Sequence, residues 1–267
     1  MLLGIDIGNT TIGLGLFPEP EGGTELFVRK IPSHPARPAE YYKREIIALL
    51  GQGGISTAPS VINQGDAILS SVVPPLTRPV LKAARELTGR KPLIVSHALQ
   101  GGLLFEVKHP DQVGADRIAT AVAGAHRYNR PVAVGDFGTA TTITVVGPRL
   151  RFLGGAIMPG LHLMQHALFS RTAQLPSVVL DRAQGALGKD TRSAIASGIL
   201  YGTAGGVESL VKSMEKELAF KVQLVLTGGY ASLLSSFIRR KHEVVPHLLF
   251  EGLRLIYLKT KGTEIWK

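Results

Sequence analysis

The stretch that decides the fold is Leu2–Phe17, which reads LLGIDIGNTTIGLGLF. An apolar run is followed by a polar turn, and apolar residues then alternate with small ones, which predicts a β-hairpin. A similar stretch, VAVGDFGTATTITVV, occupies Val132–Val146. Asp136 follows Asp6 by 130 residues, about half of the 267-residue chain. We therefore predict two halves that begin with the same hairpin.

The two hairpins share polar residues that suit phosphate binding. The aligned positions are Asp6 with Asp136, Gly8 with Gly138 and Thr11 with Thr141. Glycine lets a phosphate approach the backbone N–H groups of a turn closely. A carboxylate at the end of the first strand can hold Mg²⁺ directly or through water. One such turn is usually only a turn, but two at corresponding places predict a clamp on a polyphosphate.

Strand and helix patterns alternate after each hairpin. In the first half we expect strands at Glu25–Ile31, Ala67–Val73 and Leu93–Ser96, and helices at Tyr41–Leu50, Leu76–Thr88 and Asp116–Tyr128. In the second half we expect strands at Leu150–Met158, Gln223–Leu226 and Glu243–Val245, and helices at Leu161–Phe169, Thr191–Ala219 and Ala231–Arg239, with another at the C-terminus. This pattern predicts an α/β fold with domains at residues 1–128 and 129–267.

Composition narrows the chemistry. There is no cysteine, which excludes disulfides, thiolate metal sites and a cysteine nucleophile. The net charge of +10 favours an anionic partner, either a nucleotide or nucleic acid. The basic residues are scattered with few aromatic residues near them, which disfavours nucleic acid. We expect neither a signal peptide nor a membrane span, so the default location is the cytoplasm.

A third motif follows a late strand. Leu224-Val225-Leu226 leads into Thr227-Gly228-Gly229 and then a helix, which is a place for nucleoside or phosphate groups. Together with Asp6-Ile7-Gly8-Asn9-Thr10 and the second hairpin at Asp136, it resembles the superfamily of acetate and sugar kinases, Hsp70 chaperones and actin. That resemblance implies two duplicated ribonuclease H-like domains with an ATP cleft between them.

Further motifs narrow the resemblance over nearly the whole chain. They are Ser70-Ser71-Val72-Val73-Pro74, Val113-Gly114-Ala115-Asp116-Arg117, Asp136-Phe137-Gly138-Thr139-Ala140-Thr141-Thr142, Gly154-Gly155-Ala156-Ile157-Met158-Pro159-Gly160, Thr172-Ala173-Gln174-Leu175-Pro176 and Gly188-Lys189-Asp190-Thr191. In this order they resemble type III pantothenate kinase. The resemblance implies a homodimeric enzyme that phosphorylates pantothenate with ATP, in the first step of coenzyme A synthesis.

The resemblance also implies roles for single residues. The first ATP loop would consist of Asp6, Ile7, Gly8, Asn9, Thr10, Thr11, Ile12 and Gly13, with Asp6 near Mg²⁺. Thr139 would contact ATP, and Asp136 would hold a monovalent cation, K⁺ or NH₄⁺. Asp116 would be the general base on the pantothenate hydroxyl. The residues implied to bind pantothenate are Gly114, Ala115, Asp116, Arg117, Thr191 and position 107. An Asp before an apolar helix, taken alone, is more often a cap.

Three positions depart from the family pattern. Val107 stands where a Tyr is usual, Asp190 where an Asn is usual, and Thr144 where an Asp is usual. The Val107 side chain can neither hydrogen-bond nor stack on a substrate. The phosphate-binding residues are intact, so the departures concern the acceptor pocket.

Two other classes of function remain open. Val107 and Thr144, with the charge of +10, motivate a non-catalytic regulatory protein of the same fold, linked to transcription. Salt-dependent DNA binding without kinase activity would favour it. A ribonuclease H-like nuclease needs several clustered carboxylates around two metals, whereas Asp6 and Asp136 lie in different halves.

Overall fold

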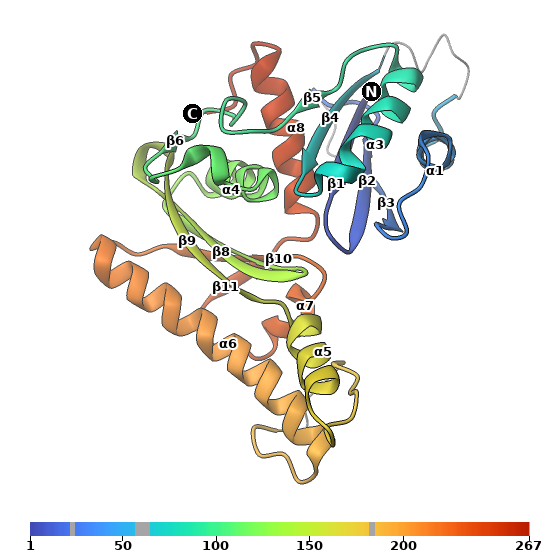
Figure 1. Ribbon diagram of the computed structural model, residues 1–267. Coiled ribbons are helices and arrows are strands. Elements are labelled where there is room, and N and C mark those ends of the chain that lie inside the picture. Colours follow the sequence, from blue (N-terminus) through green and yellow to red (C-terminus); the bar gives the residue numbers. More distant parts are fainter. Residues whose placement is uncertain (22–24, 57–64, 182–184, 267) are drawn as a thin grey trace. The chain divides into compact units, whose positions relative to one another are not determined.

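A computed structural model describes residues 1–21, 25–56, 65–181 and 185–266. The chain forms two compact units (Figure 1). The first unit consists of Met1–Leu103, Lys108–His126 and Leu248–Lys267. The second consists of Leu104–Val107 and Arg127–His247.

The first unit has a five-stranded sheet in the order β3-β2-β1-β4-β5. Its strands are β1 (Leu2–Ile7), β2 (Thr11–Phe17), β3 (Phe27–Pro32), β4 (Asp66–Ser71) and β5 (Leu93–Ile94). β1 pairs with β2 as an antiparallel hairpin and with β4 in parallel. The predicted first hairpin is therefore confirmed.

Helices cover both faces of this sheet. Helices α1 (Ala39–Gln52) and α3 (Pro74–Thr88) bury one face, in a core that includes Leu3, Ile5 and Ile7. On the other face, α8 (Leu248–Thr260) places Phe250 over the glycines of the hairpin. A Cβ atom at Gly15 would lie 2.5 Å from the Phe250 ring, so the small residues of β2 make room for this helix.

Helix α4 (Ala115–Tyr128) packs closely against α8. A Cβ atom at Gly252 of α8 would overlap the backbone carbonyl of Ala119 in α4. Glycine at this position lets the two helix backbones approach, and an added methyl group would overpack the contact.

The second unit has a six-stranded sheet in the order β11-β10-β7-β8-β9-β6. Its strands are β6 (Leu104–Phe105), β7 (Val132–Phe137), β8 (Ala140–Gly147), β9 (Arg151–Pro159), β10 (Gln223–Thr227) and β11 (His242–Val244). The order β9-β8-β7-β10-β11 repeats β3-β2-β1-β4-β5, including an antiparallel β7–β8 pair and a parallel β7–β10 pair. The predicted duplication is therefore confirmed, with β6 as an added edge strand.

The turns of the two hairpins differ by one residue. Asp6 lies opposite Gly13, whereas Asp136 lies opposite Thr142. The N–H of Gly8 donates to the Thr11 carbonyl, while the N–H of Gly138 donates to the Ala140 carbonyl. The structural counterpart of Thr11 is therefore Ala140. The predicted match of Thr11 with Thr141 was wrong, because a shorter turn moves every residue of the second strand back by one position.

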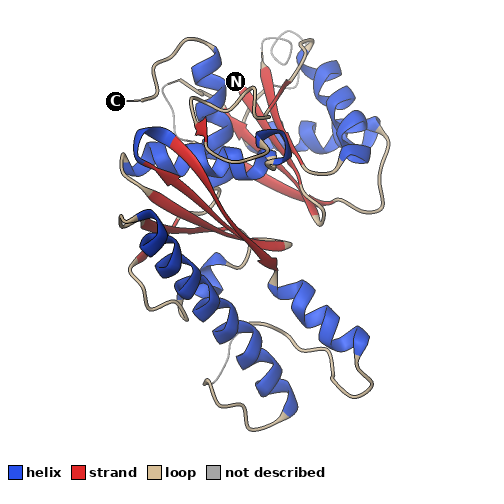
Figure 2. Ribbon diagram, turned by 60° about the vertical axis from the view of Figure 1, so that its left-hand side comes forward, coloured by secondary structure: helices blue, strands red, loops and turns tan. Residues whose placement is uncertain are grey.

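Helices of the second unit are α5 (Leu161–Arg171), α6 (Thr191–Leu218) and α7 (Ala231–Ser235) (Figure 2). Short 3₁₀ turns also occur in the described parts of the chain, at Pro110–Gln112 in the first unit and Pro148–Leu150 in the second. Helix α7 ends earlier than the predicted Arg239.

Among the described residues, α6 is the one helix whose length and mean hydropathy of 1.2 would allow a membrane span. Half of that apolar window is buried, with Leu200 and Val207 in the core, so we interpret α6 as a core helix.

The compact units differ from the predicted domains 1–128 and 129–267 at three places, of which the smallest is a boundary between His126 and Arg127 instead of after residue 128. Helix α8 returns to the first unit, where Phe250 and Gly252 make the contacts described above. The short strand β6 belongs to the second unit, where it pairs with β9. Sequence periodicity shows where elements lie along the chain but not which sheet a late helix covers.

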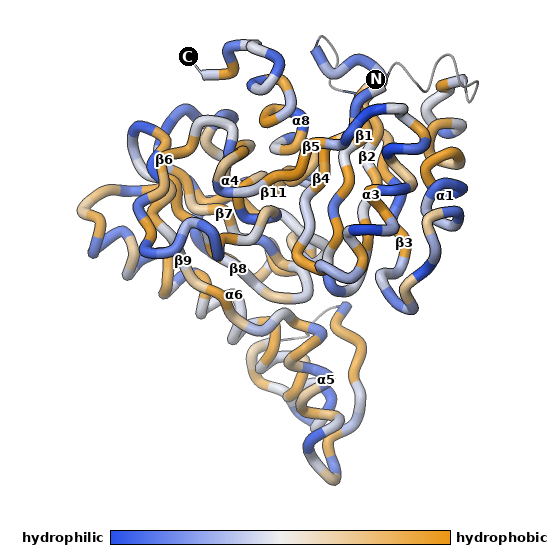
Figure 3. The backbone as a smooth tube through the Cα atoms, turned by 45° about the horizontal axis from the view of Figure 1, so that its top comes forward, coloured by the Kyte–Doolittle hydropathy of each residue, from blue (hydrophilic) through white to orange (hydrophobic). Residues whose placement is uncertain are grey.

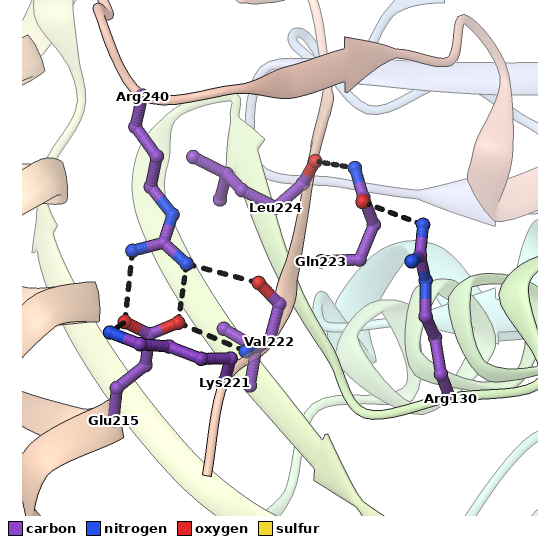
Figure 4. Close-up of polar contacts among 7 residues, drawn as sticks. All are labelled: Arg130, Glu215, Lys221, Val222, Gln223, Leu224 and Arg240. Atoms are coloured by element: carbon purple, nitrogen blue, oxygen red, sulfur yellow. Dashed lines mark hydrogen bonds and ion pairs between the residues drawn. The ribbon is translucent and has the colours of Figure 1, made fainter.

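A buried carboxylate joins three segments of the second unit (Figure 4). The Glu215 side chain is 2% exposed and accepts hydrogen bonds from Arg240, from the Lys221 ammonium group at 3.0 Å and from the Val222 N–H at 3.0 Å. Arg240 binds both carboxylate oxygens and also donates to the Val222 carbonyl. These contacts, with Arg240 first, lower the pKa of Glu215 to about 2.

Replacing Glu215 with Gln tests this cluster. The folded-state pKa lies below the usual 4.5, so the stabilisation is fully present above pH 4.5 and is lost as the pH falls towards 2. The variant should lose about 3 kcal/mol at pH 7, because the guanidinium of Arg240 loses its counter-charge. Urea denaturation at pH 7 and pH 3 should show the difference from the unmodified chain narrowing at pH 3. A difference that stays constant with pH, or an equal effect of Glu217→Gln at an exposed position of α6, would contradict the assignment.

Candidate functional site

The turn of the first hairpin is held in one conformation by backbone contacts. Gly8 N–H donates to the Thr11 carbonyl at 3.0 Å. Ser33, which is fully buried after β3, donates its hydroxyl to the Gly8 carbonyl at 2.6 Å and its N–H to the Thr10 carbonyl at 3.0 Å. Asn9, Thr10 and Thr11 remain exposed at the tip. The turn therefore presents amide and hydroxyl groups to a ligand from a fixed backbone.

The second hairpin lies beside the third motif. Thr227 pairs in register with Asp136, and the N–H of Tyr230 donates to the Phe137 carbonyl at 3.1 Å. Gly228 has a φ of 94°, in the left-handed region that favours glycine. A Cβ atom there would overlap the Asp136 carboxylate and would lie 2.6 Å from the Phe137 nitrogen. The structure thus brings the Asp136 hairpin and the Thr227-Gly228-Gly229 turn together.

Thr139 lies at the tip of the second hairpin. Its carbonyl accepts the N–H of Gly160 at 3.1 Å, at the start of α5. A Cβ atom at Gly160 would overlap the carbonyls of Gly138 and Thr139. Gly160, the last residue of the Gly154–Gly160 motif, therefore lets α5 begin in close contact with the turn of the second hairpin.

Asp116 lies in the first turn of α4. Its Oδ1 accepts the N–H of Arg117 at 2.8 Å, and a Cβ atom at Gly114 would overlap the same oxygen. Burial raises the pKa of Asp116, although the Arg117 N–H and the Arg117 charge act in the opposite direction. Burial also lowers the pKa of Arg117. The carboxylate is therefore held at the start of a helix in a site with little solvent.

The start of α4 lies near the carboxyl end of β1 and β4. A Cβ atom at Gly114 would lie 3.6 Å from Cγ1 of Val72, the residue that follows β4. The N–H of Val72 donates to the Ile7 carbonyl at 3.1 Å. The first unit therefore carries the Asp6 hairpin and the Gly114-Ala115-Asp116-Arg117 segment at the same end of one strand pair.

The remaining predicted residues belong to the second unit. Val107 follows β6 and is half-buried, with its Cγ1 3.5 Å from the position of a Cβ atom on Gly154. Thr191 is exposed at the first position of α6. Thr144 is 1% exposed within β8. Gly114, Ala115, Asp116 and Arg117 belong to the first unit.

The residues fit the cations that the family resemblance implies. Nowhere in the described parts of the chain do three His, Asp or Glu side chains gather in a metal-binding cluster. Mg²⁺ in phosphate-transferring sites commonly uses one or two carboxylates together with water and substrate phosphates, so a single Asp6 carboxylate suits it. The Asp136 carboxylate occupies the space that a Cβ atom on Gly228 would fill. Its oxygen atoms suit a cation that prefers oxygen ligands.

Two hydroxyl residues lie beside these carboxylates because of strand pairing. Ser70 of β4 pairs in register with Asp6, and Thr227 of β10 pairs in register with Asp136. Ser70 belongs to a motif already noted in the sequence. Its position beside Asp6, 64 residues earlier in the chain, depends on the parallel register of β1 and β4 and could not be read from that motif. Ser33 was also missed, since its contact with the Gly8 turn depends on β3 pairing beside β2.

The duplicated fold, with an aspartate-bearing hairpin in each unit, is shared with solved structures of other proteins. A solved structure of a Campylobacter jejuni protein assigned to the Baf family of transcriptional activators aligns with a TM-score of 0.60 and 18% identity, over 98% of this chain and 100% of that one. A ROK family glucokinase from Streptomyces griseus aligns with a TM-score of 0.51 and 12% identity, over 96% of this chain and 97% of the other. At these identities the likeness concerns the fold.

The sequence comparisons are more specific. The family model described as type III pantothenate kinase matches residues 2–213. A type III pantothenate kinase from Syntrophotalea carbinolica is 37% identical over 262 residues, which is 98% of this chain and 100% of the relative. One from Geobacillus thermodenitrificans is 36% identical over 264 residues, which is 99% of each. The chain belongs to the type III pantothenate kinase family.

The contact between Gly228 and Asp136 predicts the effect of an added methyl group. Gly228→Ala should lower the melting temperature and abolish stabilisation by Mg²⁺–ATP, because the Cβ atom overlaps the Asp136 carboxylate and φ is positive. Gly51→Ala, near the end of α1 and outside the proposed site, is the control, since no atom lies within 4 Å of its Cβ position and its φ is not positive. Differential scanning calorimetry with and without Mg²⁺–ATP measures both effects. Equal behaviour of the two variants would refute the prediction.

Proposed function

We propose that this chain transfers the γ-phosphoryl group of ATP to the primary hydroxyl of pantothenate, giving 4'-phosphopantothenate in the first step of coenzyme A synthesis. The observation that carries the proposal is the position of Asp116 at the same end of the β1–β4 pair as the Asp6 hairpin. The proposed acceptor-side carboxylate and the proposed phosphate-side turn thus belong to one folded unit. Membership of the family supports the choice of pantothenate as acceptor.

The hairpins are the proposed nucleotide-binding residues. Phosphoryl transfer depends mainly on positioning and on neutralising the charge of the phosphates. Residues Asp6–Gly13 would contact the phosphates through the turn, and Thr139 would contact them from the second hairpin. Asp6 would hold Mg²⁺ through water and Asp136 would hold K⁺ or NH₄⁺. When bound, these cations supply positive charge to the triphosphate.

Asp116 is the proposed general base. A carboxylate whose pKa is raised by burial is a stronger base than an exposed one, and it can accept the hydroxyl proton as the oxygen attacks phosphorus. The planar guanidinium of Arg117 suits the pantothenate carboxylate. Gly114, Ala115 and Thr191 complete the proposed acceptor residues. At Val107 the contact would be apolar, without the hydrogen bond that a tyrosine provides.

The proposed assembly is a homodimer formed through the second unit. Large apolar side chains are exposed there: Ile157, Leu163, Phe169, Val179 and Leu187. Helix α6 also exposes Gly198, Gly202 and Gly205, which would let another helix approach its backbone. Apolar and polar residues are mixed along α5 and the segment after it (Figure 3). Such exposed apolar side chains favour burial against a second copy of the chain. The proposed location of the dimer is the cytoplasm.

The regulatory alternative is not favoured. The relatives described as kinases align over almost the full length of this chain. The Campylobacter protein shares the fold at 18% identity, which carries no argument for a role in transcription. The residues of both phosphate hairpins are present, as expected for a catalyst rather than for a protein that retains only the fold.

Turnover tests the proposed function directly. The purified chain should consume ATP only when pantothenate, Mg²⁺ and K⁺ are all supplied, and Asp116→Asn should reduce kcat/KM by about 10²–10⁴-fold, the usual contribution of a general base. Activity of the unmodified chain should fall with decreasing pH, with the acid limb above the usual Asp pKa of 3.8, because protonated Asp116 cannot accept a proton. A coupled ADP-release assay across a pH series measures both quantities.

Asp111→Asn is the control for this experiment. Asp111 is an exposed carboxylate in the 3₁₀ turn just before α4, so its replacement should leave kcat/KM unchanged. Absence of turnover in the unmodified chain would count against the proposed function. Full activity of Asp116→Asn would instead count against the proposed base alone.

Sedimentation equilibrium tests the homodimer. The chain should sediment with about twice its mass of 28.5 kDa. Phe169→Asp should shift it to the monomer, because a charge would replace a half-exposed ring in the proposed interface. Ile94→Asp, at an exposed position of the first unit, should leave the dimer intact. A monomeric unmodified chain would rule out the proposed assembly.

A further inference from the structure

Ser70 is an exception to the rule that buried hydroxyl groups are hydrogen-bonded. It lies near the carboxyl end of β4, and its side chain is fully buried. Its Oγ has no hydrogen-bond partner among the described residues. Burying an unpaired hydroxyl lowers stability, so a serine at this position weakens the free protein relative to an alanine.

Ser70 and Asp6 project from the same face of the sheet. They are partners in the parallel register of β1 and β4, and side chains of paired residues point to the same side. That side is the one covered by α8: a Cβ atom at Gly13 would lie 3.9 Å from the Asp6 Cβ and 3.0 Å from the Phe250 ring. Neighbouring strands are about 4.8 Å apart, which lets a serine hydroxyl reach a turned aspartate carboxylate.

The second unit repeats this placement. Thr227, which is 3% exposed, is the partner of Asp136 in the parallel register of β7 and β10. Each hairpin carboxylate therefore has a hydroxyl residue beside it on the parallel strand, although the two segments have little other sequence in common. The repetition ties the hydroxyl to the carboxylate rather than to the local packing of β4.

We propose that Ser70 is a positioning residue for Asp6. Its hydroxyl donates a hydrogen bond to the Asp6 carboxylate when that carboxylate turns to hold the divalent cation of the nucleotide. Ser70 acts through Asp6 and contacts neither ATP nor the acceptor. The inference rests on the proposed function, and it deepens that function by assigning a residue that fixes the orientation of the cation-binding carboxylate.

Ser70→Ala tests this role with two readouts. The free variant should melt at the same temperature as the unmodified chain or higher, because an unpaired buried hydroxyl is removed. The Mg²⁺ concentration needed for half-maximal ATP binding should rise about tenfold, as expected when a partner of a metal-holding carboxylate is lost. The KM for pantothenate should stay unchanged. Calorimetric titration of ATP at several Mg²⁺ concentrations gives the binding readout without the acceptor.

Ser71→Ala is the matched control at the next residue. The Ser71 hydroxyl lies 2.7 Å from that of Thr77 and accepts the N–H of Val73 at 3.2 Å. Its loss should lower the melting temperature and leave the Mg²⁺ dependence unchanged. The two adjacent serines are thus expected to show opposite behaviour. Ser70→Thr, which keeps the hydroxyl, should bind Mg²⁺–ATP within about threefold of the unmodified chain, well short of the tenfold loss.

Three outcomes would overturn the proposal. One is an unchanged Mg²⁺ dependence in Ser70→Ala. Another is a Ser70→Ala chain that fails to fold or melts as low as Ser71→Ala, since the hydroxyl would then be structural. The third is Mg²⁺–ATP binding by Ser70→Thr that is as weak as that of Ser70→Ala. If Mg²⁺–ATP binds but pantothenate is not phosphorylated, the proposed acceptor fails while the role of Ser70 stands.

Discussion

The constraint on which the rest of the structure depends is the pairing of one aspartate-bearing strand on both of its edges. In each unit this strand pairs antiparallel with its hairpin partner and parallel with a later strand. Asp6 is thereby fixed between Gly13 and Ser70. Hydrogen-bond ladders on both sides leave the strand no freedom to slip, because a shift of one residue would turn every side chain to the opposite face. The position of the carboxylate is therefore a property of the sheet.

Small residues then decide how closely other elements approach this strand. Gly13 and Gly15 admit the Phe250 ring, and Gly252 admits the backbone of α4. The α4 helix in turn begins just after Gly114, which lies against Val72, the residue that follows β4. Burial of Asp116 and its raised pKa follow from this packing. The chemistry proposed for Asp116 thus depends on close contacts made far from it along the chain.

The departures from the family pattern have different physical meanings. Asp190 is the N-cap of α6: its carboxylate accepts the Ser193 N–H at 2.9 Å, and this contact lowers its pKa. Asn and Asp are comparable N-cap residues, so the change preserves the start of the helix on which Thr191 lies. Val107 places an aliphatic side chain where the family pattern has a polar ring, and at the proposed acceptor site this would remove a hydrogen-bonding group. The first change keeps a structural role, while the second would alter the chemistry of the proposed site.

The sequence by itself determined the two hairpins, most strand and helix positions, the duplicated topology and the family, because each rests on local periodicity or on motifs contiguous in the chain. It also singled out Asp6, Asp116 and Asp136 as candidates. Only the tertiary structure decided the shorter second turn, the return of α8 to the first unit and the pairing of Ser70 with Asp6. These features depend on strand register and on contacts between distant segments. Hydrogen bonding and packing between distant parts of the chain determine them, so a local sequence pattern does not predict them.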